Sequence, residues 1–296
     1  MAGMLKRLLG AGLGAWMAGA AVPAAWTADA AVPADRIAVQ LYSLHAALLR
    51  DPATALDRLR AMGVTQVEAY GTLGMSPSDF RAALDKAGLT AVGSHVWLGD
   101  LRDNPEKIVE TARAVGYRYV GVAWIKPPDA SPGQAISRAD VDAAIAAYKA
   151  ACPVLKAAGL GVMYHIHGYE FVPDGDGILL DRLLAGLDPD CVDIELDVFW
   201  VVKAGADPVA LLDRLGSRVK MLHLKDMVPQ AAVGDFTGQA PPGDFAPVGQ
   251  GRVDWPALLA AARRAGVEWY VLEDESADAA RHLEQSLEWL RGHALP

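Results

Sequence analysis

Eight short apolar segments alternate with eight longer amphipathic segments along the chain, and this alternation limits the possible folds more than any other feature. The short segments are rich in β-branched residues and have the period of strands, whereas the longer ones have the period of helices. Strict alternation of strand and helix favours a parallel sheet with crossover helices. The predicted strands are 37–41, 66–70, 91–95, 119–124, 161–167, 192–197, 219–223 and 269–273.

The intervening helices complete an α/β chain whose eight units, in about 260 residues, fit a single (β/α)8 barrel. An open, doubly wound sheet is the alternative, but the turn Gln40-Leu41-Tyr42-Ser43 lacks the glycines of a nucleotide-binding loop. Several helices end at a glycine that fits a C-cap, as at Gly88 and Gly116. The predicted helices lie near 51–62, 77–87, 104–115, 138–158, 177–186, 207–216, 254–265 and 277–291.

The N-terminus has the pattern of a secretory signal. Lys6 and Arg7 precede an uncharged run, and Ala28-Asp29-Ala30 follows as a small-x-small cleavage site. A membrane anchor is the alternative, but the run is mostly Ala and Gly with Pro23 inside it. We therefore expect a signal peptide over 1–30, a barrel domain over 31–296, a periplasmic or secreted location, and no stable membrane insertion after cleavage.

Two cysteines, Cys152 and Cys191, are present in this chain. Export to an oxidising compartment would allow them to pair. Cys152 falls in a predicted helix and Cys191 just before a predicted strand, so nothing in the sequence sets their distance. We expect two buried free thiols.

Composition restricts the class of partner. The chain is 52% apolar and 21% charged, which excludes a disordered protein. Its formal charge of −9 opposes sequence-independent nucleic-acid binding, which depends on cationic neutralisation of phosphates. We expect no nucleic-acid partner, and the oligomeric state stays open, with a homo-oligomer among the alternatives.

Polar residues gather at the carboxyl ends of the predicted strands, where a barrel carries its chemistry. Period-two alternation places the apolar residues of each strand against the helices and the polar ones inside the barrel. Mixed histidine and carboxylate ligands suit Mn²⁺, Fe²⁺, Co²⁺ or Zn²⁺ better than Ca²⁺. The inward-facing residues are His165 and His167 on strand 5, Glu195 and Asp197 on strand 6, His223 and Lys225 on strand 7, and Glu273 on strand 8.

These motifs resemble the xylose isomerase-like TIM barrel superfamily of sugar phosphate isomerases and epimerases. The resemblance covers roughly residues 36–292. Within the superfamily, the chain is similar to an exported branch with a Tyr-His-x-His-x-x-Glu-Phe motif. The pieces that carry it are Tyr164-His165-Ile166-His167-Gly168-Tyr169-Glu170-Phe171, Glu195-Leu196-Asp197-Val198-Phe199-Trp200, His223-Leu224-Lys225-Asp226, Gly249-Gln250-Gly251-Arg252-Val253-Asp254-Trp255, and Glu273.

The resemblance implies one divalent metal (Mn, Co, Zn, Fe or Mg) held by residues from strands 5 to 8. Carried over, it implies Asp197, His223 and Glu273 as ligands. Strand 5 departs from the family pattern, because His167 occupies the position of the usual glutamate and Glu170 follows in the loop. Either residue could bind the metal.

The remaining candidates have catalytic or substrate-binding roles. His165, His167 or Glu170 could be the base, although a buried structural histidine is an equal alternative for His165. Lys225 could neutralise an enolate or orient a carboxylate. Glu195 lies deeper than Asp197 and is interpreted as structural. We expect the substrate pocket to include Glu68, His95, Trp124 and Trp200, with core packing as the alternative for the two tryptophans.

The predicted function is a divalent-metal-dependent sugar isomerase or epimerase. It would abstract the α-proton of a keto- or aldo-sugar through a metal-bound enediolate. Trp200 stands where the family often has a histidine, so the acid/base pair of an epimerase is not intact. The alternatives are a keto-sugar dehydratase or 3-keto-glycoside lyase, a non-catalytic sugar-binding barrel, and a metal phosphodiesterase that the negative charge disfavours.

A long non-periodic stretch over residues 228–248 follows predicted strand 7. Long loops at the mouth of a barrel are often lids. We expect a lid there, with a surface insertion as the alternative.

Overall fold

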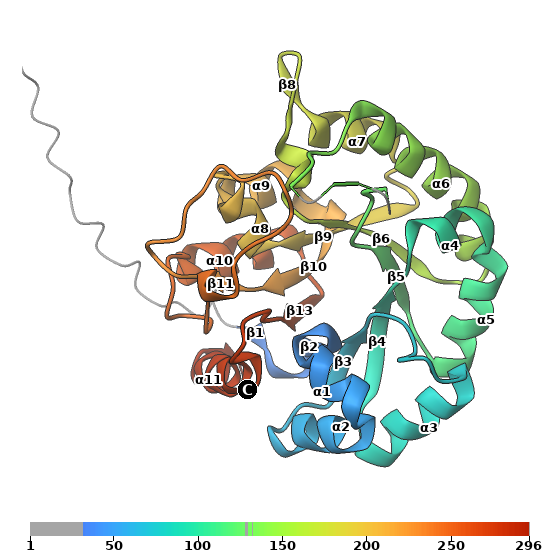
Figure 1. Cartoon of the computed structure of the whole chain (residues 1–296), viewed down its shortest axis with the longest axis vertical. Helices are drawn as coiled ribbons and strands as arrows, with labels where there is room; N and C mark the ends of the chain where they lie inside the picture. The colour runs from blue at the N-terminus through green and yellow to red at the C-terminus, as the bar shows by residue number, and fades with distance from the viewer. Residues whose placement is uncertain (1–31, 128–129, 132, 296) are drawn as a thin grey trace, which may run out of the picture.

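Eight parallel strands close into a barrel, and the helices form a ring around it (Figure 1). The structure is a computed structural model that describes residues 32–127, 130–131 and 133–295. The (β/α)8 barrel expected from the sequence is therefore confirmed. The barrel strands are β2 (Ile37–Gln40), β3 (Gln66–Ala69), β4 (Thr90–His95), β5 (Tyr119–Val122), β6 (Gly161–Ile166), β9 (Val192–Asp197), β10 (Val219–Leu224) and β13 (Trp269–Leu272).

Each barrel strand pairs with the barrel strands before and after it in sequence, and β13 closes the barrel against β2. Three short helices, α1, α4 and α8, add to the eight that the sequence predicts. The helices are α1 (His45–Arg50), α2 (Pro52–Ala61), α3 (Pro77–Ala87), α4 (Leu98–Asp103), α5 (Pro105–Val115), α6 (Arg138–Ala157), α7 (Leu179–Gly186), α8 (Val198–Lys203), α9 (Pro208–Leu215), α10 (Trp255–Ala265) and α11 (Ala279–Gly292).

Three small sheets lie outside the barrel. β1 (Val32–Pro33) pairs with β14 (Ala294–Leu295), which brings the two ends of the described chain side by side. β7 (Pro173–Asp174) pairs with β8 (Gly177–Ile178), and β11 (Asp226–Met227) pairs with β12 (Phe245–Ala246). Among the described residues, none of the helices combines the length and apolarity needed to span a membrane.

Two apolar clusters show which side chains of the strands point into the barrel and which point toward the helices. The larger fills the space between the barrel and the helices, and it includes Tyr164, Leu196 and Leu222. A smaller one inside the barrel contains Met163 and Met221. Because side chains alternate along a strand, Met163 and Met221 share the inward face with His165 and His223, as the alternation predicted.

Cys152 and Cys191 form a disulfide, with their Cα atoms 6.2 Å apart. The expectation of two free thiols is therefore wrong. The packing of α6 against the residue before β9 sets this distance, and that packing cannot be read from either sequence segment alone. The predicted signal peptide over 1–30 lies outside the described residues.

Candidate metal centre and active site

Strand register brings the predicted polar residues into one layer inside the barrel. His165 of β6 lies opposite Glu195 of β9, and Asp197 of β9 lies opposite His223 of β10. All four side chains are buried. Side chains from adjacent strands at matching register meet on the same face of the sheet, so three strands deliver histidines and carboxylates to a single point.

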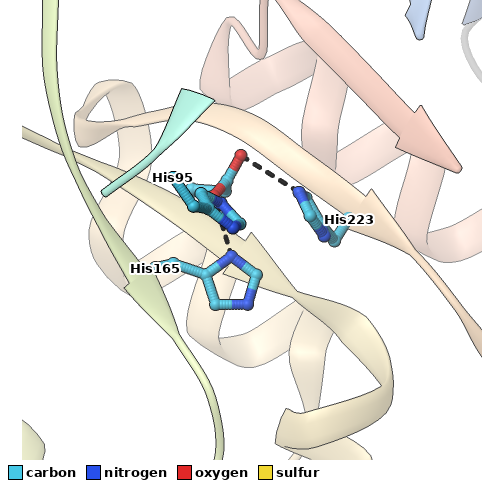
Figure 2. Close-up of side chains that lie close together, drawn as sticks. His95, His165 and His223 are labelled. Carbon is cyan, nitrogen blue, oxygen red and sulfur yellow. Dashed lines mark hydrogen bonds and ion pairs between the residues drawn. The ribbon is translucent and has the colours of Figure 1, made fainter. Parts of the chain in front are cut away.

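Figure 2 shows how three histidines of the first group of potential ligands, His95, His165 and His223, converge. Glu195 belongs to the same group and contacts all three. Its Oε2 atom is 2.7 Å from His95 Nε2 and 2.7 Å from His165 Nδ1. Its Oε1 atom is 3.1 Å from His223 Nε2. The sequence analysis interpreted Glu195 as structural, and the structure puts its carboxylate within reach of every histidine in the group.

His223 also belongs to a second group, with Asp197 and Glu273. Its Nδ1 atom is 2.9 Å from Glu273 Oε2 and 3.8 Å from Asp197 Oδ2. These three residues are the ones that the family resemblance implied. The structure thus brings the implied strand-6, strand-7 and strand-8 ligands together.

Lys225 contacts the second group and forms ion pairs with three carboxylates. Its Nζ atom is 3.0 Å from Asp197 Oδ2, 2.8 Å from Glu273 Oε2 and 2.7 Å from Glu275 Oε1. Burial opposes the charge, but the three carboxylates outweigh it and raise the pKa of Lys225 well above its usual value. The ammonium group is therefore charged at neutral pH.

Glu68 lies within the polar layer, where it is almost fully buried. Its Oε2 atom accepts a hydrogen bond from Gln40 Nε2 at 2.7 Å and lies 2.8 Å from His223 Nε2. Burial and the nearby Glu195 raise the pKa of Glu68, against the opposing effect of His95 and His223. Gln40 was not among the residues singled out from the sequence, because nothing distinguishes it there from a solvated glutamine.

The histidines differ in charge. Burial lowers the pKa of His165 to about 4, so its imidazole is neutral at pH 7. Burial also opposes the charged form of His223, but Glu195 and Glu68 raise its pKa well above the usual value. Without a metal, His223 therefore supplies a positive charge between the carboxylates.

The donor set fits a divalent cation. Four buried carboxylates, those of Glu68, Glu195, Asp197 and Glu273, surround one lysine and the histidines. The Oε1 atom of Glu195 and the Oδ2 atom of Asp197 are buried and make no hydrogen bond among the described residues, although His223 Nε2 and Lys225 Nζ lie 3.1 Å and 3.0 Å away as ion-pair partners. A divalent ion would neutralise excess negative charge, engage these two atoms and accept neutral imidazole ligands.

A cavity of about 630 Å³ opens at the carboxyl ends of the strands. Its lining includes His165 of the first group, Glu273 of the second, and Lys225. Aromatic side chains form much of its wall, as expected for a pocket that receives a sugar ring. The aromatic lining residues are Tyr42, Tyr70, Trp97, Trp124 and Trp200.

His167 lines this cavity but belongs to neither ligand group. Its ring stacks on Trp200 with centroids 4.4 Å apart. The Nδ1 atom is buried and has no hydrogen-bond partner in the described part of the chain. Burial, together with His165 and Lys225, lowers the pKa of His167 well below its usual value. His167 is therefore a neutral group in the wall of the cavity.

Glu170 lies behind His167 and outside both ligand groups. Its carboxylate accepts hydrogen bonds from the Tyr164 hydroxyl at 2.7 Å and from the His167 backbone N–H at 3.0 Å. Tyr164 is on the helix side of β6. Burial raises the pKa of Glu170 to about 7. The structure thus gives Glu170 a local role in holding the turn after β6.

The loop over residues 228–248 contributes Gly238, Gln239 and Ala240 to the cavity wall. Lys126 Nζ donates a hydrogen bond to the Thr237 carbonyl at 2.6 Å, and Lys203 pairs with Asp244 at 2.7 Å. The loop therefore lies against the cavity as the sequence predicted, although whether it moves stays a prediction.

Asp226 anchors the segment from Gly249 to Trp255, which leads into α10. Its buried carboxylate accepts hydrogen bonds from the backbone N–H groups of Gly249 and Gly251, each at 3.0 Å, and from Trp255 Nε1 at 2.7 Å. A Cβ atom at Gly251 would lie 2.1 Å from Asp226 Oδ1. Gly251 therefore allows the close approach that lets one carboxylate anchor this loop.

The sequence model of the Xylose isomerase-like TIM barrel family matches residues 56–293, which is most of the chain. This protein therefore belongs to that family, as its motifs predicted. The match begins after β2 and includes every residue of the two ligand groups.

Curated relatives include inosose dehydratases. The one from Lacticaseibacillus casei is 26% identical over 132 residues, which is 42% of this chain but only 43% of that protein. The one from Geobacillus kaustophilus is 23% identical over 251 residues, 77% of this chain and 81% of that protein.

Solved structures share the fold. A sugar phosphate isomerase/epimerase from Parabacteroides distasonis is 24% identical, with a TM-score of 0.68 over 86% of this chain and 92% of that one. The IolI protein with a bound zinc atom is 14% identical, with a TM-score of 0.63 over 86% and 96% of the two chains. The names of the curated relatives support the expectation of a sugar-modifying enzyme.

Proposed function

We propose that this protein is a divalent-metal-dependent sugar isomerase or epimerase that removes the α-proton of a keto- or aldo-sugar. One observation carries the proposal: two groups of potential ligands share His223, and members of both line a cavity with aromatic walls. Abstraction of an α-proton needs a base and stabilisation of the negative charge that develops, and neutral imidazoles, a charged lysine and a metal bound by these ligands would supply both.

Asp197, His223 and Glu273 would hold the metal, and Glu195 is close enough to complete the ligand set through its contact with His223. When bound, a divalent metal would stabilise negative charge that develops on the carbonyl and hydroxyl oxygens of the sugar. The zinc-bound IolI neighbour supports a metal in this fold, and the metal's identity stays open.

Lys225 would stabilise the same negative charge from the side of the cavity. It remains protonated because Asp197, Glu273 and Glu275 surround it. Its role is therefore electrostatic, since a lysine with a raised pKa is a poor base.

His165 is the candidate base. Its Nδ1 atom is 2.7 Å from Glu195, and a carboxylate at that distance fixes the proton on Nδ1. The Nε2 atom is then free to accept a proton, and the low pKa of His165 keeps the ring neutral. His167 is the second candidate, because it is neutral and also lines the cavity.

Elimination is the second candidate reaction, and two observations favour it. Curated relatives of this chain are named inosose dehydratases. Trp200 is buried and stacks on His167, at the place where the family resemblance would put a further histidine. Loss of a β-substituent after α-proton abstraction needs no base on the opposite face of the sugar, whereas epimerisation does.

Deuterium exchange tests the shared first step. Metal-loaded protein in D₂O, incubated with a panel of ketoses, inososes and keto-glycosides, should incorporate deuterium next to the carbonyl, as measured by NMR. His165→Gln should slow the exchange by about 10²–10⁴-fold. His282→Gln, which removes another buried histidine outside the cavity lining, is the matched control. Equal exchange by wild type and His165→Gln would refute His165 as the base.

We also propose that the protein is exported and acts in the periplasm or outside the cell. The signal pattern of residues 1–30 suggests it, and the Cys152–Cys191 disulfide supports it, because such bonds persist in oxidising compartments. Mass spectrometry of the exported form should find an N-terminus near Ala30. An intact Met1 in the membrane fraction would contradict the proposal.

A further inference from the structure

A second, smaller cavity of about 180 Å³ adjoins the main one. It lies between the ends of β3 and β4 and the helices α4 and α5. The two cavities share Tyr70, His95, Val96 and Trp97 in their linings. We call it the side pocket, and define it by the polar residues Thr72, Ser94, Asn104, Lys107, Thr111 and Tyr117.

Tyr117 gives the side pocket an unused hydrogen-bonding group. The side chain is 6% exposed, and its hydroxyl has no hydrogen-bond partner in the described part of the chain. The Ser94 hydroxyl lies close to it without hydrogen-bond geometry, and its one proton is donated to the His95 carbonyl at 3.1 Å, so it is not available to Tyr117. A buried hydroxyl without a partner is costly unless a ligand or water supplies one.

The charges of the side pocket indicate a neutral ligand. Its lining contains one acid, Asp100, and one lysine, Lys107, together with hydroxyl and amide groups. The lining of the adjoining main cavity contains two carboxylates, Glu273 and Glu275, and both are paired with Lys225. Neither lining contains an arginine, so the two pockets lack the bidentate donor that is typical of a phosphate site, whereas sugar hydroxyls both donate and accept hydrogen bonds and match a mixed lining.

Trp97 connects the two cavities. It belongs to both linings, and 70% of its surface is exposed. An exposed indole at the junction of two pockets provides a flat apolar face against which a sugar ring can stack. The main cavity alone, at about 630 Å³, is also in the range that holds a ligand larger than one sugar.

We propose that the side pocket is a second sugar subsite, so that the natural substrate is an unphosphorylated glycoside with its reacting ring in the main cavity and its second polyhydroxylated ring in the side pocket. This inference rests on the proposed function only in that the main cavity must receive a sugar. It adds a substrate class: neutral disaccharides or related glycosides, and not sugar phosphates.

Binding of unreactive sugars tests the subsite without turnover. Isothermal titration of the full protein with glucose and with maltose, cellobiose and trehalose should show at least one disaccharide binding about tenfold or more tightly than glucose, the effect of one or two net hydrogen bonds. Tyr117→Phe, which removes only the unpaired hydroxyl, and Thr111→Phe, which fills the pocket, should each reduce that preference several-fold while glucose affinity stays unchanged.

Tyr119→Phe is the matched control, because its hydroxyl donates to Glu268 Oε2 at 2.7 Å and lies outside both pocket linings. It should keep the disaccharide preference. Equal affinity of glucose and all three disaccharides, or an unchanged preference in Tyr117→Phe, would overturn the subsite. Deuterium exchange that is absent while the preference persists would refute the proposed function alone. Binding of no sugar at all would refute both.

Discussion

Glu195 is the single side chain on which the candidate metal centre depends most. Its carboxylate contacts His95, His165 and His223 and has one oxygen without a hydrogen bond. Glu195→Gln removes the negative charge but keeps the shape, so metal affinity should fall by about 10–100-fold, the usual loss when a residue that ligates or orients ligands is removed. Metal content after dialysis, measured by mass spectrometry, checks this.

Asp193→Asn is the control for this substitution, because Asp193 is on the same strand but outside both ligand groups. It should retain the metal content of the wild type. Full metal occupancy in Glu195→Gln would show that Glu195 neither binds nor orients the ion.

Glu170 should make stability depend on pH. Burial raises its folded-state pKa to about 7 from the ordinary 4.5. A carboxyl with a raised pKa contributes stability that is complete below about pH 4.5 and is lost as pH rises through about 7. The free energy of unfolding of wild type, relative to Glu170→Gln, should therefore fall by about 3 kcal/mol between pH 4.5 and 8. Urea denaturation at several pH values measures it, and a difference that does not vary with pH would contradict the assignment.

Residues on regular strands were the most predictable part of the site. Asp197, His223 and Glu273 come together because alternation and strand order alone place them at one mouth. The neighbours of Glu195 were less predictable, because alternation gives the face of a residue but not which side chains of the adjacent strands it meets. Those neighbours depend on the stagger between strands, which sets Glu195 opposite His165.

At the scale of elements, the loop over residues 228–248 depends on a glycine that contacts the site. Gly238 has φ of +67°, and a Cβ there would lie 2.6 Å from Tyr169 Cδ1 and 3.1 Å from His167 Nδ1. Gly238→Ala should therefore displace the loop from the cavity. Thermolysin should cleave this segment faster, and kcat/KM should fall by up to about 10²-fold, as expected when positioning is lost.

Gly234→Ala separates displacement from backbone strain. Gly234 also has a positive φ, of +84°, but a Cβ there meets nothing within 4 Å. Both variants carry the cost of a left-handed alanine, about 1–2 kcal/mol. Proteolysis and kcat/KM that change equally in the two variants would show that contact with the site is unimportant.

Helices and strands were predicted to within a few residues, because their hydrophobic periods are local. The turn after β6 was not, because a 3-10 turn over Tyr169–Phe171 carries Glu170 away from the cavity and against Tyr164. No local pattern distinguishes that outcome from one in which Glu170 points at the metal. The difference arises from a hydrogen bond to the opposite face of the strand.

At the scale of the whole molecule, the fold was predictable because eight alternating units permit few closed arrangements. The disulfide was not predictable, because it depends on how α6 packs beside the segment that enters β9. Two segments 39 residues apart can lie at any distance until the barrel closes. Pairing of cysteines thus follows from tertiary structure, whereas strand order follows from the sequence pattern.

The Cys152–Cys191 bond should stabilise the whole barrel. It spans 39 residues of sequence, and restriction of the unfolded chain by a loop of that size contributes about 4 kcal/mol. In a domain of this length, dithiothreitol should therefore lower Tm by about 10 °C. The variant with both Cys152→Ala and Cys191→Ala should have the Tm of the reduced protein and no response to dithiothreitol. Protein recovered from the exported fraction should contain no titratable thiol after denaturation. Two thiols in that fraction would show that the bond does not form in the native compartment. A Tm that reduction leaves unchanged would show that the bond does not stabilise the fold.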